Sequence, residues 1–169
     1  MVDLISHALW AFAFFHDLSN AWLYVGFTLL PDLLWGAPLF IFLILTRRLG
    51  KIKGIKWHSN QKQGEVEGVP INFIHKAYHL SHSWLVMSLT SVLVFIFIPS
   101  ITLPFIGGVF LHLTFDLFLH KDSVSGQMPL YPLSFYRVKG FIHWSNRKFM
   151  ILNYLMLTIA YVLILIYHI

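Results

Sequence analysis

The sequence predicts an all-α membrane protein: a single domain over residues 1–169, built as a polytopic bundle of about four to five membrane-embedded helices. Of the 169 residues, 57% are hydrophobic and only 11% are charged, and the mean hydropathy is +0.70. An ordinary soluble domain carries roughly 25% charged residues. The absence of cysteine excludes a disulfide framework and any thiolate metal site, so a metal would need histidine and carboxylate ligands. The net charge of +5 does not indicate a nucleic-acid partner, because most basic residues lie beside hydrophobic segments, where membrane topology explains them.

Apolar segments and the breaks between them define the expected helices. Their ranges are 3–16, 21–30, 35–46, 75–98, 103–120 and 149–167. Pro31 disfavours helix at the residue before it and suits the first turn of a new helix, so we expect a break there. The segment 75–98 is expected to be one continuous helix, long enough to span a hydrocarbon core of about 30 Å. Segments 55–73 and 121–146 contain glycine, proline and polar residues and are predicted to be loops.

Basic residues give the expected orientation. Lysine and arginine cluster at 47–62 and at 137–148, and the positive-inside rule assigns both segments to the cytoplasm. Strict alternation of spans would then put Asp32 on the opposite side of the membrane from 47–62. We therefore expect 33–48 to lie tilted or re-entrant rather than to cross completely.

Two rows of ionisable residues recur at helical spacing in these apolar segments. One row is His112, Asp116 and His120, and the other is His75, His79 and His82. Residues three or four apart share one face of a helix, and ionisable groups inside a membrane usually face a functional site. Facing helices that each supply such a row can build a metal site in a bundle. Gly107 and Gly108 come just before the first row and should let a neighbouring helix approach closely.

Five short motifs, taken together, resemble a known bacterial family. They are SH at 6–7, LLPD at 29–32, SHS at 81–83, HLTFD at 112–116 and GQMPLYP at 126–132. In order and spacing, over roughly residues 5–135, they are similar to the inner-membrane metal-dependent hydrolases of the LexA-regulated type. No single motif is specific for that family, and the resemblance rests on their order.

The resemblance implies a set of metal ligands: His7, Asp32, His82, His112 and Asp116. The chain departs from the family pattern at Leu34, where the family has a second aspartate, and at Ala77 and Tyr78, where it has a His-Arg pair. We expect His79 to replace the lost histidine and His120 to supply other lost ligand capacity. These departures argue against a two-metal site and leave a site for one ion.

The expected function is a metal-dependent hydrolase that cleaves an ester or phosphoester of a membrane lipid or lipid-linked substrate at the cytoplasmic face of the inner membrane. The expected metal is zinc, with manganese or iron as alternatives, and it would activate a water molecule. Asp116 or Asp32 is expected to accept the proton of that water, and His79 to be needed for activity. The candidates for substrate binding are Arg137, Lys139 and Ser83, the first two as partners of a phosphate.

Other interpretations of the same residues stay open. A ceramidase-like amide hydrolase also uses serine, histidine and aspartate on membrane helices, although its motif order fits less well. A non-catalytic metal-binding or metal-transporting protein would use the same ligands, and interhelical hydrogen bonding alone would need no metal. Arg137 and Lys139 can instead be part of the positive-inside signal. Asp32 can instead be a helix-start residue near exposed backbone N–H groups.

Overall fold

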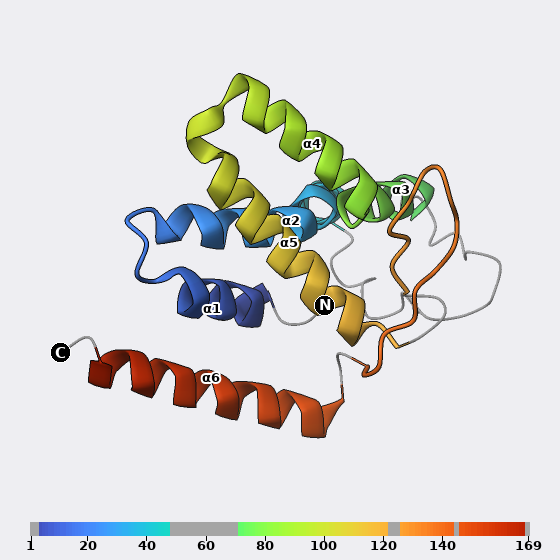
Figure 1. Ribbon diagram of the computed structural model, residues 1–169. Coiled ribbons are helices and arrows are strands. Elements are labelled where there is room, and N and C mark those ends of the chain that lie inside the picture. Colours follow the sequence, from blue (N-terminus) through green and yellow to red (C-terminus); the bar gives the residue numbers. More distant parts are fainter. Residues whose placement is uncertain (1–3, 48–70, 122–125, 144–145, 168–169) are drawn as a thin grey trace.

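The computed structural model describes residues 4–47, 71–121, 126–143 and 146–167, and these are mainly helical (Figure 1). The helices are α1 (Leu4–Phe15), α2 (Ala21–Leu45), α3 (Ile71–Ser81), α4 (Trp84–Phe97), the short 3-10 helix η2 (Pro99–Ile101), α5 (Thr102–Leu119) and α6 (Arg147–Tyr167). In the described part of the chain there is no strand, only two isolated β-bridges, so the all-α prediction is confirmed.

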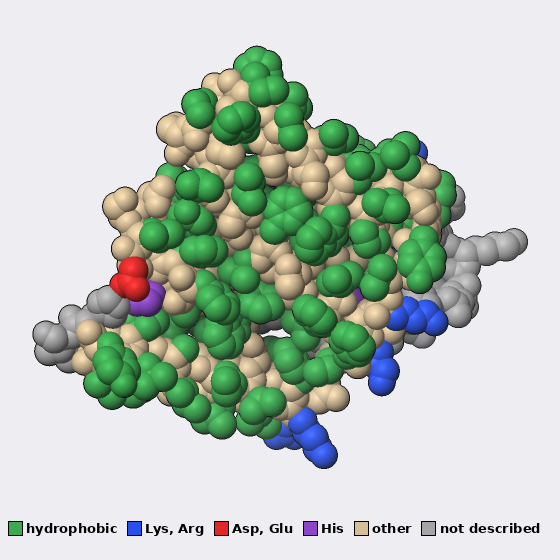
Figure 2. Space-filling view, in the orientation of Figure 1, with side chains coloured by type: hydrophobic (Ala, Val, Ile, Leu, Met, Phe, Trp, Pro, Cys, Tyr) green, Lys and Arg blue, Asp and Glu red, His purple; other side chains and the backbone are tan. Residues whose placement is uncertain are grey.

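Three helices are long and apolar enough to cross a membrane: α2, η2 together with α5, and α6. The segments Phe73–Ser81 and Trp84–Phe97 pass the same test as a pair, although they are bent by 64° at the break between them. Helix α1 is apolar but shorter. Figure 2 shows hydrophobic side chains across most of one face of the molecule, with lysine and arginine visible mainly toward its right-hand and lower margins. Both observations are consistent with a membrane protein.

Helix α2 is continuous through Pro31 and Pro38, so the expected break at Pro31 is wrong. A proline inside a helix removes one backbone hydrogen bond, and packing against other helices can offset that loss. Pro31 is fully buried, and α2 packs against both α1 and α5. Because α2 has 25 residues, it is long enough to cross a membrane without the re-entrant turn that we expected at 33–48.

The bent segment lies instead between α3 and α4, within the range 75–98 where one continuous helix was expected. Ser83 starts α4 as its N-cap, with its side chain accepting a hydrogen bond from the backbone N–H of Val86 at 3.3 Å. The Ser83 hydroxyl also lies 3.1 Å from the carbonyl of Pro129 and 2.7 Å from that of Tyr131, as a donor. The Leu85 N–H donates to the Pro129 carbonyl at 2.9 Å. The break is therefore stabilised by the segment after α5.

Close contact between α2 and α5 depends on Gly107 and Gly108. A Cβ atom at Gly108 would lie 2.5 Å from the carbonyl oxygen of Tyr24 and 2.8 Å from the backbone nitrogen of Thr28. At Gly107 a Cβ atom would lie 2.7 Å from the ring of Tyr24. The expectation that these glycines admit a neighbouring helix is confirmed, and that neighbour is α2.

The described part of the segment 121–146 has no helix before Arg147 and folds back over the end of α5. The N–H of Gly140 donates to the carbonyl of His120 at 2.8 Å, and the N–H of Val138 donates to that of Gln127 at 2.9 Å. A Cβ atom at Gly140 would lie 2.6 Å from the carbonyl oxygen of Phe118, so only glycine fits there. The predicted loop at 55–73 falls mostly outside the described residues, and α3 begins at Ile71.

Candidate metal centre

Five buried histidine and aspartate residues meet where α1, α2 and α5 converge on the break between α3 and α4. They are His7 on α1, Asp32 on α2, His82 at the break, and His112 and Asp116 on α5. Their exposed fractions lie between 0% and 5%. All five positions that the family resemblance implies are therefore close together in space, although they span more than a hundred residues of sequence.

The carboxylate of Asp116 is the centre of this cluster. Its Oδ1 lies 3.4 Å from Nε2 of His7, and its Oδ2 lies 3.4 Å from Nε2 of His82 and 3.6 Å from Nε2 of His112. Asp32 belongs to α2, and its Oδ1 lies 3.6 Å from Nε2 of His82. Each of these atoms is one that commonly binds a metal in proteins.

His112 belongs to both of the groups that could hold a metal ion among the described residues. One group is His7, Asp32 and His112, and the other is His82, His112 and Asp116, with ligand atoms within 4.8 Å of one another in each. The His112 ring stacks on that of His7 at a centroid distance of 4.3 Å, and its Nε2 lies 3.2 Å from Nε2 of His82. Because the two groups share His112, they describe one connected centre.

The spacing of these atoms fits a small cation better than a hydrogen-bond network. Nε2 of His7 and Oδ1 of Asp116 are 3.4 Å apart, yet neither atom has a hydrogen-bond partner. Nδ1 of His112 is also buried without a partner. Around a tetrahedral ion with bonds of roughly 2.0–2.1 Å, the ligand atoms lie about 3.3–3.4 Å apart. The observed separations of 3.2–3.6 Å agree with that value. The residues present therefore fit a bound metal ion.

Surrounding contacts orient the ligands. Nδ1 of His82 lies 3.0 Å from the carbonyl of Tyr78, and because a carbonyl can only accept, this contact favours the tautomer with its proton on Nδ1. That tautomer leaves Nε2 of His82 free to bind a metal, the arrangement usual for metal-binding histidines. The Tyr78 ring also stacks on His82 at 4.2 Å. On the other side, Nε1 of Trp35 donates to Oδ1 of Asp32 at 3.3 Å.

The supporting roles of Tyr78 and Trp35 were not found from the sequence. Trp35 follows Asp32 by three residues and Tyr78 precedes His82 by four, so the i, i+3 and i, i+4 spacings were available as signals. Gln127 was missed as well: it is fully buried, and both of its amide atoms lack a hydrogen-bond partner. Its position in the motif at 126–132 was the only hint.

Asp32 lies in the middle of α2, eleven residues after Ala21 and thirteen before Leu45. At about 1.5 Å per residue it is roughly 16–20 Å from either end. The helix-start interpretation of Asp32 is therefore wrong, because backbone N–H groups are exposed only in the first turn.

We expect Asp32→Asn to lower the metal content of the purified protein while leaving it folded, because the amide keeps the shape of the carboxylate and loses its charge. Metal content by inductively coupled plasma mass spectrometry and helicity by circular dichroism measure the two effects. Asp17→Asn is the matched control, since Asp17 lies near His16 in the turn after α1 with a side chain that is 63% exposed. A fully loaded Asp32→Asn protein would exclude Asp32 as a metal ligand and leave it only as a candidate proton acceptor.

His120 and His79 lie beside the cluster and are in neither of the two groups. Nδ1 of His120 lies 2.9 Å from the carbonyl of Asp116 and 3.9 Å from its Oδ2, so this ring supports the end of α5. The ring of His79 contacts Tyr78 at 5.3 Å and Tyr131 at 5.5 Å, and its Nδ1 is buried without a partner. His75 packs on His79 at 6.0 Å. His79 and His120, which were expected to replace lost ligands, therefore lie at the edge of the cluster.

Two alanine variants distinguish a residue of the metal centre from a residue at its edge. His82→Ala should lose the metal because it removes an atom within 3.2–3.6 Å of three other candidate ligands. His79→Ala should keep the metal, in contrast to the sequence-based expectation that His79 acts as a ligand. Equal loss of metal in the two variants, at equal helicity, would show that His79 turns inward and binds.

The predicted substrate-binding residues divide into two sets. Arg137 is half-buried and interacts electrostatically with His75, His79 and Tyr78, so it lies next to the centre's margin. Partial burial lowers the pKa of its guanidinium, and arginine stays charged at neutral pH. Lys139 is exposed. The Ser83 hydroxyl is fully buried and bonded at the break, so it is not available to a substrate.

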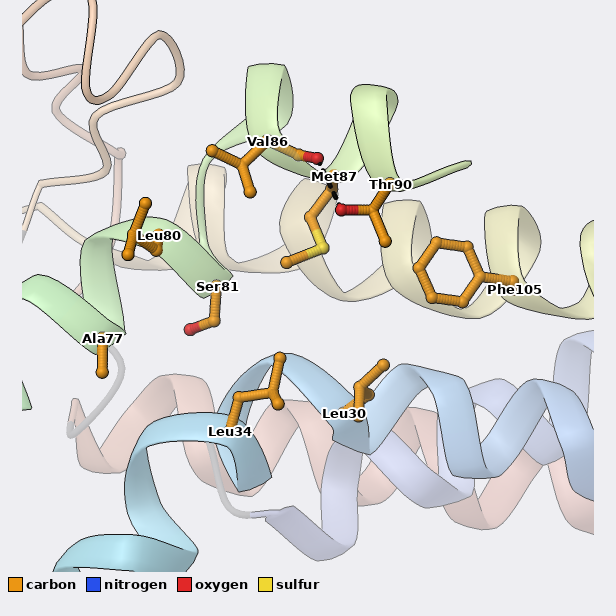
Figure 3. Close-up of a pocket in the computed structure, with 9 residues that line it drawn as sticks. All are labelled: Leu30, Leu34, Ala77, Leu80, Ser81, Val86, Met87, Thr90 and Phe105. Atoms are coloured by element: carbon orange, nitrogen blue, oxygen red, sulfur yellow. Dashed lines mark hydrogen bonds between the residues drawn. The ribbon is translucent and has the colours of Figure 1, made fainter. Parts of the chain in front are cut away.

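Leu34 lies at a pocket that is separate from the metal-centre cluster. It lines a pocket of about 310 Å³ between α2, α3, α4 and α5, together with Leu30, Ala77, Leu80, Ser81, Val86, Met87, Thr90 and Phe105 (Figure 3). Two residues along a helix correspond to a turn of about 200°, so Leu34 and Asp32 point in nearly opposite directions. Ser81 connects this pocket to the centre, because its Oγ lies 2.9 Å from Nδ1 of His82.

The chain was compared with protein-family models, curated proteins and solved structures. None of the three comparisons finds a match. The resemblance to the metal-dependent hydrolases therefore stays a hypothesis that rests on the motifs and on the cluster they form.

Proposed function

We propose that this chain is a membrane-embedded, metal-dependent hydrolase that cleaves an ester or phosphoester bond of an amphiphilic, lipid-like substrate. The observation that carries the proposal is the convergence of three histidines and two aspartates, all buried, in two groups that share His112 and whose ligand atoms lie within 4.8 Å of one another. Buried ionisable residues are costly in an apolar bundle and usually mark a functional site. Such a set is also larger than a purely structural hydrogen-bond network requires, since several of its atoms have no partner.

Zinc is the ion that the ligand set favours. Imidazole and carboxylate groups suit zinc, manganese and iron, and the observed separations match tetrahedral bonding of about 2.0–2.1 Å better than the shorter spacings of an octahedral ion. Such an ion would polarise the scissile oxygen and lower the pKa of water to about 7. The side chains of the protein would orient the ion and accept the proton of the water.

The two aspartates have different surroundings, and this suggests different roles. Asp116 lies within 3.9 Å of four histidines, so its carboxylate is committed to the ligand set. Asp32 contacts His82 at 3.6 Å and receives a hydrogen bond from Trp35 at 3.3 Å. The less crowded Asp32 carboxylate is the better candidate to accept the proton of the attacking water.

Charge and hydrophobicity beside the centre support an amphiphilic substrate. Arg137 can offer two parallel N–H donors to a phosphate or carboxylate, and Lys139 adds a second positive charge nearby in sequence. Both belong to the basic segment that the positive-inside rule assigns to the cytoplasm. We therefore propose the cytoplasmic face of a bacterial inner membrane as the place of reaction.

Metal analysis and hydrolysis, measured on the same purified full-length protein, test the proposal. The protein should contain about one equivalent of metal, should lose hydrolysis of p-nitrophenyl esters or phosphoesters after chelation, and should regain it with zinc. The substrates should include short-chain and long-chain versions of each. Metal binding without hydrolysis of any of them would favour a non-catalytic metal-binding protein, and absence of metal would favour structural histidines.

A further inference from the structure

A second cavity, of about 300 Å³, lies between α1, α5 and α6. Its walls are mostly apolar and include Trp10, Phe115, Phe118 and Leu152. Figure 2 shows the surface hollowed between α6, along the lower edge, and the bundle above it. A cavity of roughly 150 Å³ already accommodates a benzene molecule, so this one has room for several carbons of a hydrocarbon chain.

Apart from His7, the polar side chains along this cavity are bonded to one another. Nε1 of Trp10 donates to Oδ1 of Asn153 at 2.9 Å, and Nδ2 of Asn153 donates to the Ser6 hydroxyl at 2.8 Å. A buried water needs two to four polar partners, and apolar cavities without them stay dry. The cavity therefore favours hydrocarbon over water.

One end of the cavity reaches the metal centre. His7 lines it, and the same ring lies 3.4 Å from Asp116 with both nitrogens buried and without hydrogen-bond partners. The α6 wall of the cavity is partly exposed, with Leu152 at 55% and Met156 at 48%. A chain lying in the cavity would thus run from these partly exposed residues to the candidate ligands.

Charge at the start of α6 indicates which lipid would fit. Arg147 and Lys148 are exposed and directly precede Phe149, which lines the cavity. Basic residues at the end of a membrane helix attract anionic headgroups. An anionic lipid could therefore hold its headgroup at this basic pair while its chain enters between α1 and α6.

We propose that this cavity binds the hydrocarbon chain of an anionic membrane lipid and presents that lipid to the metal centre beside His7. The assignment of this lipid as the substrate rests on the proposed hydrolase function, whereas chain binding itself does not require hydrolysis. The cavity would then form the hydrophobic part of the substrate site, and its apolar lining would favour lipids over water-soluble esters.

Photo-crosslinking tests chain binding. Full-length protein in phosphatidylcholine vesicles is irradiated with phosphatidic acid that carries a diazirine in one acyl chain, and the labelled residues are mapped by mass spectrometry. Label should concentrate on Phe115, Leu152 and Met156 of the cavity. The same diazirine chain on phosphatidylcholine should label them less. Equal labelling by both lipids would overturn the anionic preference.

Filling the cavity gives the matched comparison. Leu152→Trp should lower labelling of the cavity at least about fivefold, the effect of roughly 1 kcal/mol from overpacking. Ile151→Trp makes the same change of size at the neighbouring residue, which is about as exposed (62% against 55% at Leu152) but does not line the cavity, and should leave labelling unchanged. Met156→Trp is the second filling variant should Leu152→Trp not accumulate. Equal labelling in filled and control variants, or label spread evenly over α6, would overturn the proposal.

Metal content and hydrolysis of a long-chain ester, measured on the same samples, separate the two proposals. If only the hydrolase proposal fails, the cavity is still labelled while no metal-dependent product forms. If only the cavity proposal fails, product forms and the label shows no preference for the cavity.

Discussion

Replacing His112 by alanine should abolish stoichiometric metal binding. His112 belongs to both groups that could hold an ion, and its Nε2 lies 3.2 Å from that of His82 and 3.6 Å from Oδ2 of Asp116. Loss of a residue that only supports a ligand typically costs 10–100-fold in metal affinity. Loss of this shared ligand should therefore cost more than about 100-fold. Competition with a chelator of known affinity measures the change.

The control is His16→Ala. His16 is also a histidine near a helix end, but its Nδ1 contacts the carbonyl of Ala13 and it lies outside the cluster. It should keep the wild-type metal content and activity. Unchanged metal affinity in His112→Ala, with wild-type helicity, would refute the assignment of the cluster as a metal centre.

Gly108→Ala should lower the free energy of unfolding and weaken metal binding together. The added methyl group would lie 2.5 Å from the Tyr24 carbonyl and 2.8 Å from the Thr28 nitrogen, and these backbone atoms can move only if α2 moves. Overpacking of this kind costs about 1–3 kcal/mol. For a chain of this size the melting temperature falls by about 2–4 °C per kcal/mol. Because α2 carries Asp32, its displacement should also disturb the ligand set.

Gly26→Ala, on the facing helix α2, should have the opposite effect. No atom lies within 4 Å of a Cβ built at Gly26, and alanine is favoured over glycine inside a helix by about 1 kcal/mol. Its melting temperature should stay equal or rise, with metal content unchanged. A Gly108→Ala protein as stable as Gly26→Ala would mean that α2 and α5 do not pack as closely as they do here.

The local part of the centre could be predicted from the sequence. Helical periodicity alone puts His112 and Asp116 on one face of α5, and the order of the motifs added His7, Asp32 and His82. Both kinds of information are present in the chain without reference to packing. Composition likewise predicted an all-helical protein with helices that can cross a membrane.

The errors arose where distant contacts override local preference. Pro31 normally ends a helix, but burial between α1 and α5 keeps α2 continuous. Ser83 looked like an ordinary residue inside a long helix, and it becomes an N-cap because carbonyls 46 and 48 residues later accept its hydroxyl. His79 lies on α3, before the break, and His82 lies at the break itself. Because the chain bends there, the i, i+3 spacing of the two residues does not place them together in the cluster.

The contacts of Ser83 also have a consequence for biosynthesis. The carbonyl of Tyr131 is made 48 residues after Ser83, and a ribosome that adds about 5–20 residues per second needs roughly 2–10 s to reach it. Asp116, the last of the five clustered residues in the chain, emerges before Pro129 and Tyr131. A nascent chain between these points carries every ligand and lacks the partners that hold His82 at the break. In the proposed hydrolase, metal binding is therefore expected to be completed after the segment beyond α5 has folded back.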